Sequence, residues 1–301
     1  MRRLMGVLAI GVVAALMGST AAKADQLAEI KKKGTLIVGV KTDYPPWGMR
    51  DASGNIVGTE PDMAADVAKR LGVKLELVSV VSSNRMQFLQ QGKIDLMIAT
   101  MSDTPERRKV VGIVDPVYYA SGVAILANKK ANIKGAGDLK GKPVCALQGA
   151  FYNNELQSKY TGTDLVAFKG IPEAEQALLD GRCVGFVYDD VVLVWKKAQD
   201  KKWEAFDVVA LPEWKPVPWG LAVKTEELSG PWGKFMAEAT KDWLKSGTLL
   251  ALEKKWVGSN TQCLIDASAA AKNKAMGTVA VHEGAQPQVA SPRHTPSSAS
   301  I

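Results

Sequence analysis

The sequence is poor in the residues that most often serve catalysis and metal binding. Among 301 residues there are two histidines, His282 and His294, both within the last 20 positions, and three cysteines. This scarcity argues against a Ser-His-Asp triad, a histidine metal site or a histidine proton shuttle in the body of the chain. The cysteines are 38 and 80 residues apart and form no CxxC motif. We therefore expect no metal and no cofactor.

Basic runs are short as well. The longest are Lys31-Lys32-Lys33 and Arg107-Arg108-Lys109, whereas a nucleic-acid-binding surface requires a clustered basic stripe with aromatic residues between the charges. The remaining composition is ordinary, with 47% hydrophobic and 23% charged residues. It argues against whole-chain disorder, collagen-like repeats and a polytopic membrane protein. The length suits one large or two medium domains.

The N-terminus has the pattern of a secretory signal peptide over 1–24. Two arginines precede an apolar run at 4–17, and the small-x-small triplet Ala22-Lys23-Ala24 predicts cleavage before Asp25. The alternative is a single membrane anchor, but the run is shorter than the roughly 20 apolar residues of a spanning helix. Cleavage lowers the formal net charge from +7 to +4, because it removes three basic residues. We expect a soluble periplasmic protein, and no cysteine near the cleavage point suggests a lipoprotein.

The order of predicted elements is that of an α/β protein. Strands are predicted at 35–40, 74–80 and 94–99, and helices at 26–33, 61–71 and 85–91. The rhythm restarts with strands at 123–127, 143–147, 165–168 and 184–188, and helices at 172–179 and 191–198. A strand at 220–223 and helices at 228–245 and 248–256 follow a proline-rich stretch. This alternation predicts two lobes, each a mostly parallel sheet flanked by helices.

The predicted boundaries follow from where the rhythm breaks. Lobe 1 takes residues 25–120 plus 218–262, and lobe 2 takes residues 121–217. The chain crosses between the lobes twice, near 119–123 and 212–219. Residues 263–301 are rich in Ala, Ser and Lys and then in Pro, Ser and Gln, which predicts a disordered tail.

Polar residues gather after the predicted strands of both lobes. They are Lys41-Thr42-Asp43, Ser82-Ser83-Asn84-Arg85, 100–104 with Arg107, Gln148-Gly149 and Asp189-Asp190. Open α/β sheets bind ligands at the carboxyl ends of their strands. Arg107 can clamp a carboxylate with two hydrogen bonds, and Asp189 can hold an ammonium group. Together they predict a receptor for an amino acid zwitterion, whereas the alternative for each residue is a solvated loop charge.

Several motifs resemble those of the family 3 solute-binding proteins, the periplasmic receptors of polar amino acid ABC transporters. They are Gly58-Thr59-Glu60-Pro61-Asp62-Met63 through Leu71-Gly72, Gly92-Lys93-Ile94-Asp95-Leu96, and Met101-Ser102-Asp103-Thr104-Pro105-Glu106-Arg107. The resemblance spans about 30 to 260, and Ser-x-Thr-x-x-Arg at 102–107 is its most specific element. Thr59 and Pro61 depart from the usual aromatic-acidic-aliphatic run. The resemblance implies a type II periplasmic-binding-protein fold with two hinge crossings.

The resemblance also implies roles for individual residues. Arg107, helped by Ser102 and by the backbone near Phe151, clamps the α-carboxylate of the ligand. Asp189, with Thr100, binds the α-ammonium group.

The segment 181–190, the residues 82–85 and Lys41 look most like the glutamate/aspartate branch, in which Lys41, Ser82 and Arg85 hold the side-chain carboxylate of the ligand. Two features depart from this branch. Its histidine falls near Ile171, and its threonine pair is replaced by Ala150-Phe151.

Bland interpretations stay open for several of these residues. Arg85 also fits a surface arginine at a helix start, and Lys41 fits a charge at the rim of the site. Tyr44 and Trp47 either stack on a ligand or pack a loop. Related proteins with cysteines at Cys145 and Cys183 suggest a disulfide, and two separate buried thiols are the alternative.

The predicted function is that of a monomeric receptor that closes on glutamate or aspartate and delivers it to an inner-membrane ABC permease. One alternative is an enzyme that resembles periplasmic cyclohexadienyl or arogenate dehydratases, for which Asp43 is the candidate proton donor. Another is a ligand-sensing domain, which we disfavour because neither a membrane span nor a signalling domain follows residue 260.

Overall fold

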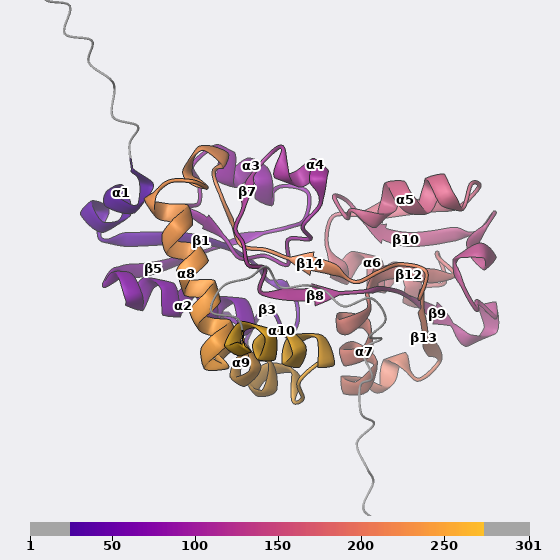
Figure 1. Ribbon diagram of the computed structural model, residues 1–301. Helices are drawn as coiled ribbons and strands as arrows, with labels where there is room; N and C mark the ends of the chain where they lie inside the picture. Colours follow the sequence, from indigo (N-terminus) through magenta and orange to yellow (C-terminus); the bar gives the residue numbers. More distant parts are fainter. Residues whose placement is uncertain (1–24, 274–301) are drawn as a thin grey trace, which may run out of the picture.

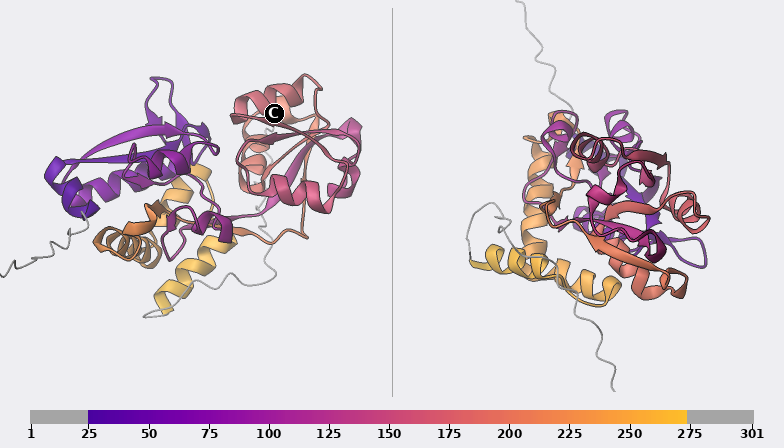
Figure 2. Two further views of the ribbon diagram at one scale, coloured as in Figure 1. Left: turned by 90° about the horizontal axis from the view of Figure 1, so that it is seen from above. Right: turned by 90° about the vertical axis from the view of Figure 1, so that its right-hand side faces the viewer.

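We describe residues 25–273 from a computed structural model of the chain. The predicted signal peptide and residues 274–301 of the predicted tail lie outside the described residues. Two five-stranded sheets form two lobes, with strand orders β5-β1-β6-β15-β7 in lobe 1 and β11-β10-β12-β9-β13 in lobe 2. Figures 1 and 2 show the two sheets on opposite sides of the strands that connect them.

The strands of the lobe 1 sheet are β1 Thr35–Lys41, β5 Lys74–Val80, β6 Leu96–Met97, β7 Gly112–Ile113 and β15 Ala222–Val223. Those of the lobe 2 sheet are β9 Val123–Asn128, β10 Pro143–Leu147, β11 Asp164–Phe168, β12 Gly185–Asp189 and β13 Phe206–Ala210. A separate small sheet joins β2 Asp43–Tyr44, β3 Gly48–Arg50 and β4 Ile56–Val57, which accounts for the glycine turns at 54 and 58.

Each five-stranded sheet has one strand that runs against the other four. In lobe 1, β15 is antiparallel to β6 and β7, while β1 is parallel to β5 and β6. In lobe 2, β9 is antiparallel to β12 and β13, while β10 is parallel to β11 and β12. Each reversed strand is the first strand of its sheet after a crossing between the lobes. The predicted two-lobe α/β fold with mostly parallel sheets is thereby confirmed.

The two crossings pair with each other. Strand β8 (Tyr119–Ser121) leads into lobe 2 and β14 (Val217–Trp219) leads back, and they form an antiparallel ribbon between the lobes (Figure 1). Pro218 lies within β14, a position that a two-stranded ribbon tolerates because only one side needs donors.

Helices cover both sheets. In lobe 1 they are α1 Gln26–Lys33, α2 Thr59–Leu71, α3 Arg85–Gln90, α4 Pro105–Arg108, α8 Pro231–Ser246, α9 Thr248–Val257 and α10 Gln262–Asn273. In lobe 2 they are α5 Tyr152–Lys159, α6 Ile171–Leu179 and α7 Asp190–Gln199. The 3-10 turns are η1 Lys129–Ala131, η2 Ala136–Leu139, η3 Lys201–Trp203 and η4 Thr225–Glu227. Helix α5 and strand β13 are absent from the sequence-based prediction.

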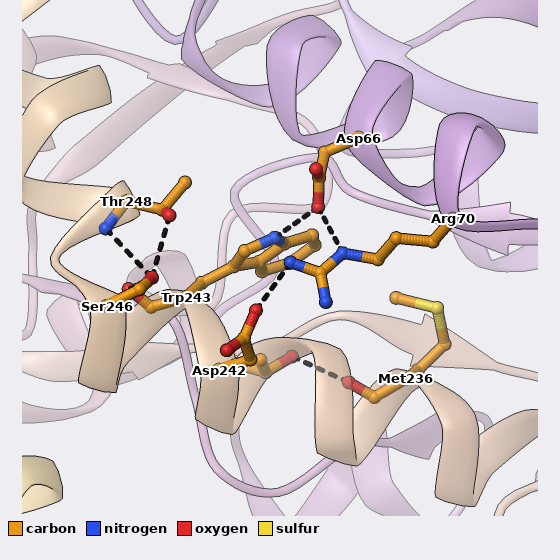
Figure 3. A network of polar contacts seen from close by, with 8 residues as sticks. Asp66, Arg70, Met236, Asp242, Trp243, Ser246 and Thr248 are labelled. Carbon is orange, nitrogen blue, oxygen red and sulfur yellow. Dashed lines mark hydrogen bonds and ion pairs between the residues drawn. The ribbon is translucent and has the colours of Figure 1, made fainter.

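Helix α2 shows how local sequence determines an element. Pro61 lies in its first turn, where the missing N–H costs nothing, and Gly72 ends it in the left-handed conformation with φ 68°. Met63 and Val67 are buried on one face. On the outer face, Arg70 donates to Asp66 and to Asp242 of α8, and Trp243 of α8 donates to Asp66 (Figure 3). This polar network fixes α8 on α2.

The structure differs from the predicted tail at its beginning. Residues Gln262–Asn273 form helix α10, which packs on α8, α9 and β8. The helix forms because Leu264 and Ser268, one turn apart, face the body of the protein and are buried. Composition alone suggested disorder because the outward face of the helix is rich in alanine, serine and lysine.

Lobe 2 contains a disulfide between Cys145 and Cys183. Cys145 lies on β10, and Cys183 comes two residues before β12, the strand that pairs with β10. Cys263 is a free thiol.

Candidate functional site

Polar residues at the carboxyl ends of the strands in the two lobes meet each other. In lobe 1 they follow β1, β5 and β6, and in lobe 2 they follow β10 and β12. Four hydrogen bonds cross between the lobes: Arg107 to Gly149, Tyr44 to Asp189, Lys41 to Tyr188 and Ile171 to Asp43. Residues from the five strand ends are therefore brought into one region.

Arg107 is a buried guanidinium without an acidic partner. The short helix α4 carries it, and the Thr104 hydroxyl caps that helix by accepting the Arg107 N–H. Its Nη1 donates to the Ser102 carbonyl at 3.1 Å and its Nη2 to the Gly149 carbonyl at 2.9 Å. Among the described residues it forms no ion pair within 4.0 Å. Burial, with Arg85 nearby, lowers the pKa of Arg107 to about 9, so the site favours an added carboxylate.

Asp189 supplies the complementary charge from lobe 2. It ends β12, is 7% exposed and accepts the Tyr44 hydroxyl at 2.6 Å. Burial raises its pKa to about 6, although the Tyr44 hydrogen bond and Lys41 act to lower it. Its charge also favours the protonated form of Arg107. A buried carboxyl that has only a hydroxyl partner is suited to accept an ammonium group.

Lys41 is buried rather than placed at a rim. Its Nζ donates to the Tyr188 hydroxyl at 2.7 Å and lies 4.5 Å from the centre of the Tyr44 ring, a cation–π distance. Burial lowers the pKa of Lys41 to about 8, and the negative charge of Asp43 opposes that shift. Tyr44 packs edge-on against Trp47 at 5.7 Å between ring centres, so both aromatic residues pack within this region.

Arg85 is also buried, at 3% exposure, and not on the surface. It begins α3, and its Nη1 donates to the carbonyl oxygens of Ala99 and Thr100. Its Nε has no hydrogen-bond partner among the described residues. Burial lowers the pKa of Arg85. A guanidinium with a free donor in a buried place is suited to an anionic or carbonyl group.

The other predicted residues lie beside these groups. Ser102 pairs with Trp219 of β14. The Ser82 carbonyl lies 2.8 Å from where a Cβ on Gly149 would be, so only glycine, here at φ 78°, allows the lobes to approach so closely. Phe151 is half-buried and packs on Tyr152. Arg107 contacts the backbone at Gly149 rather than at Phe151.

Sequence reasoning missed four residues of this region. Tyr188 precedes Asp189 on β12, and its hydroxyl accepts from Lys41. The Tyr152 hydroxyl is buried without a hydrogen-bond partner among the described residues. Glu60 is fully buried and accepts from Thr100 and Tyr118. The only signal for these residues was the presence of acidic and aromatic residues near the strand ends.

Asp43 is placed differently from a proton donor. Its Oδ2 accepts the Ile171 N–H at 3.2 Å, at the first residue of helix α6. Within residues 25–273 no group of three or more His, Cys, Asp and Glu side chains is arranged to hold a metal ion. None of the helices in that range has the length and hydropathy of a membrane-spanning segment.

The chain belongs to the bacterial extracellular solute-binding proteins, family 3, whose sequence profile matches residues 36–259. It is 31% identical to the L-cystine-binding protein TcyJ of Escherichia coli over 85% of this chain and 95% of that protein. It is 30% identical to the glutamine-binding protein GlnH of Bacillus subtilis over 79% and 87%. An ancestral amino acid-binding protein, described as a precursor of cyclohexadienyl dehydratase, matches with a TM-score of 0.68 and 31% identity over 77% and 99%.

These comparisons confirm the predicted family and separate it from the enzyme alternative, because the relatives are named as binding proteins. The resemblance to the glutamate/aspartate branch is weaker. A glutamate/aspartate import solute-binding protein of Salmonella typhimurium is 27% identical over 68% of this chain and 71% of that protein.

Proposed function

We propose that this chain is the amino acid-binding protein of an ABC transporter, working outside the cytoplasm as a monomer and passing its ligand to a membrane permease. Family membership supports the class, and relatives are named as an ABC transporter glutamine-binding protein and a periplasmic amino acid-binding protein. The observation that carries the proposal is the pair Arg107 and Asp189. The two residues come from different lobes, are buried, and interact electrostatically without forming an ion pair.

An amino acid zwitterion satisfies both groups at once. Its α-carboxylate accepts two hydrogen bonds from Arg107, with Ser102 beside it, and its α-ammonium group donates to Asp189, with Thr100 nearby. Both charges are already desolvated in the protein, so a ligand of opposite polarity gains more here than at a solvated surface.

For the side chain of the ligand we propose a carboxylate held by Lys41, Arg85 and Ser82, which makes glutamate or aspartate the preferred ligand. A neutral polar amino acid is the second candidate. The specific observation in its favour is Asp43, whose charge acts on Lys41 and would oppose an added carboxylate. Relatives named for cystine and glutamine support the same candidate.

The first experiment is a thermal-shift screen of the twenty common amino acids and cystine, followed by calorimetry on those that raise the melting temperature. Arg85→Ala is then tested with glutamate and with glutamine. If the acidic preference is right, the Kd for glutamate rises roughly 30-fold or more, since a buried charge pair loses one side, while the Kd for glutamine changes little. Glutamine serves as the internal control for a disturbed site. Equal effects on both ligands, or none on either, would remove the acidic assignment.

A further inference from the structure

Glu60 is a buried acidic residue that the proposed ligand contacts do not use. It lies in the first turn of α2 with its side chain fully buried. Its Oε1 accepts the Thr100 N–H at 2.7 Å and the Tyr118 hydroxyl at 2.5 Å, whereas Oε2 has no hydrogen-bond partner among the described residues. Burying a carboxyl group is costly, so we asked what its contact with Thr100 does.

Thr100 has an unusual backbone conformation. Its φ is 46°, in the left-handed region, which a β-branched residue rarely adopts. Such a conformation persists only where the surroundings hold it. Here both sides of the residue are held by buried charged side chains, because Glu60 accepts the N–H and Arg85 donates to the carbonyl at 3.0 Å.

The segment around Thr100 in turn orients both guanidinium groups of the site. Arg85 donates to the carbonyl oxygens of Ala99 and Thr100, and Arg107 donates to that of Ser102. A rotation of the Thr100 backbone would move all three carbonyl groups. Neither arginine has an acidic side chain that would hold it in place instead, among the ion pairs of the described residues.

We propose that Glu60 is a positioning residue that holds Thr100 in the left-handed conformation and so aims the carbonyl groups that orient Arg85 and Arg107. The inference rests on the proposed amino acid binding. Glu60 acts from a helix 40 positions earlier in the chain than the backbone that it fixes, and it touches the ligand only through that backbone.

A double-mutant cycle tests this role, because glycine adopts the left-handed conformation without help. Glu60→Ala is compared with the wild type, and Glu60→Ala/Thr100→Gly with Thr100→Gly, by calorimetry with the amino acid that binds best. In the threonine background, Glu60→Ala weakens binding by about tenfold or more, and in the glycine background by about threefold or less. Glu60→Gln, which keeps the acceptor oxygen, retains most of the affinity.

The comparison within each background cancels the loss of the Thr100 hydroxyl. A purely structural role for Glu60 predicts the same loss in both backgrounds, and that result overturns the inference. If Glu60→Ala alone does not fold, folding of the double variant supports the proposal, and failure of both variants contradicts it.

The melting temperature provides a readout that needs no ligand. Glu60→Ala is expected to lower it more with threonine than with glycine at position 100, and equal shifts overturn the inference. If no amino acid binds the wild type, the proposed function fails, while this thermal cycle still decides the role of Glu60.

Discussion

Two arginine environments in this protein use the same side chain for different purposes. On the outer face of α2, Arg70 contacts the carboxylates of Asp66 and Asp242 at 2.5 and 2.6 Å (Figure 3). Although burial acts against it, these hydrogen bonds raise the pKa of Arg70. Between the lobes, Arg107 has only backbone carbonyl partners, and burial lowers its pKa. An arginine whose acidic partners are supplied by the protein stabilises the fold, whereas one without them is available to a ligand.

The contrast is sharpest between two neighbours in the chain. Arg108, next to Arg107, makes ion pairs with Asp103 at 2.6 Å and Asp115 at 2.9 Å. These hydrogen bonds hold the pKa of Arg108 above its ordinary value. One residue in a basic pair thus anchors a loop, while the other points into the region between the lobes.

The largest expected effect comes from breaking this contrast at Arg107. Arg107→Ala is expected to weaken the binding of any amino acid by roughly 30-fold or more, about 2–5 kcal/mol, because the α-carboxylate loses its charged partner. The matched control is Arg108→Ala, which is expected to lower the melting temperature but to change affinity by less than about threefold. Calorimetry and thermal unfolding of both variants make the comparison. Equal losses of affinity would refute the distinction.

The second prediction concerns pH and the buried acid behind the two guanidinium groups. Burial raises the pKa of Glu60 from 4.5 to about 7, although Tyr118 and Thr100 oppose the shift with hydrogen bonds. The folded protein therefore holds the proton more tightly than the unfolded chain. The stability that this provides is fully present below 4.5 and is lost as the pH rises through 7.

Relative to Glu60→Gln, the wild type is expected to lose on the order of 3 kcal/mol of unfolding free energy between about pH 4.5 and pH 8. Urea unfolding of both proteins across this range measures the difference. Parallel stability curves for the two proteins would show that Glu60 does not titrate in this window.

The smallest effect is expected at the outer network. Arg70→Ala removes two ion pairs whose side chains are 32–54% exposed, so we expect a loss of about 1 kcal/mol or less. Amino acid affinity should not change, because the network is remote from the ligand residues. Asp242→Asn is the control for the charge alone. A large loss of affinity in either variant would mean that the α2–α8 contact is coupled to the site.

Much of the fold was predictable because the elements carry strong local signals. Strands β5 and β10 and helix α1 have the bounds expected from the sequence, and α2 ends at the glycine that predicted its end. Short elements were missed. The helix at α10 depends on burial of Leu264 against other helices, a contact that composition does not reveal.

The site was predictable in its location and less so in its details. Polar residues after five strands indicated where a ligand binds, and the structure brings those strand ends together. Lys41 and Arg85 turned out to be buried, which the charge of the residues alone does not indicate. The burial of Glu60 behind Thr100 had no local signal, because the two residues meet across 40 positions of sequence.

The sequence by itself determined the order of strands and helices and which residue types follow each strand, since both depend on near neighbours in the chain. Only the tertiary structure decided which charges are neutralised within the protein. Whether a guanidinium finds a carboxylate depends on the direction of its side chain and on acids brought near by folding, as Asp115 is to Arg108 and Asp242 is to Arg70. Desolvation then determines how strongly the remaining charges act.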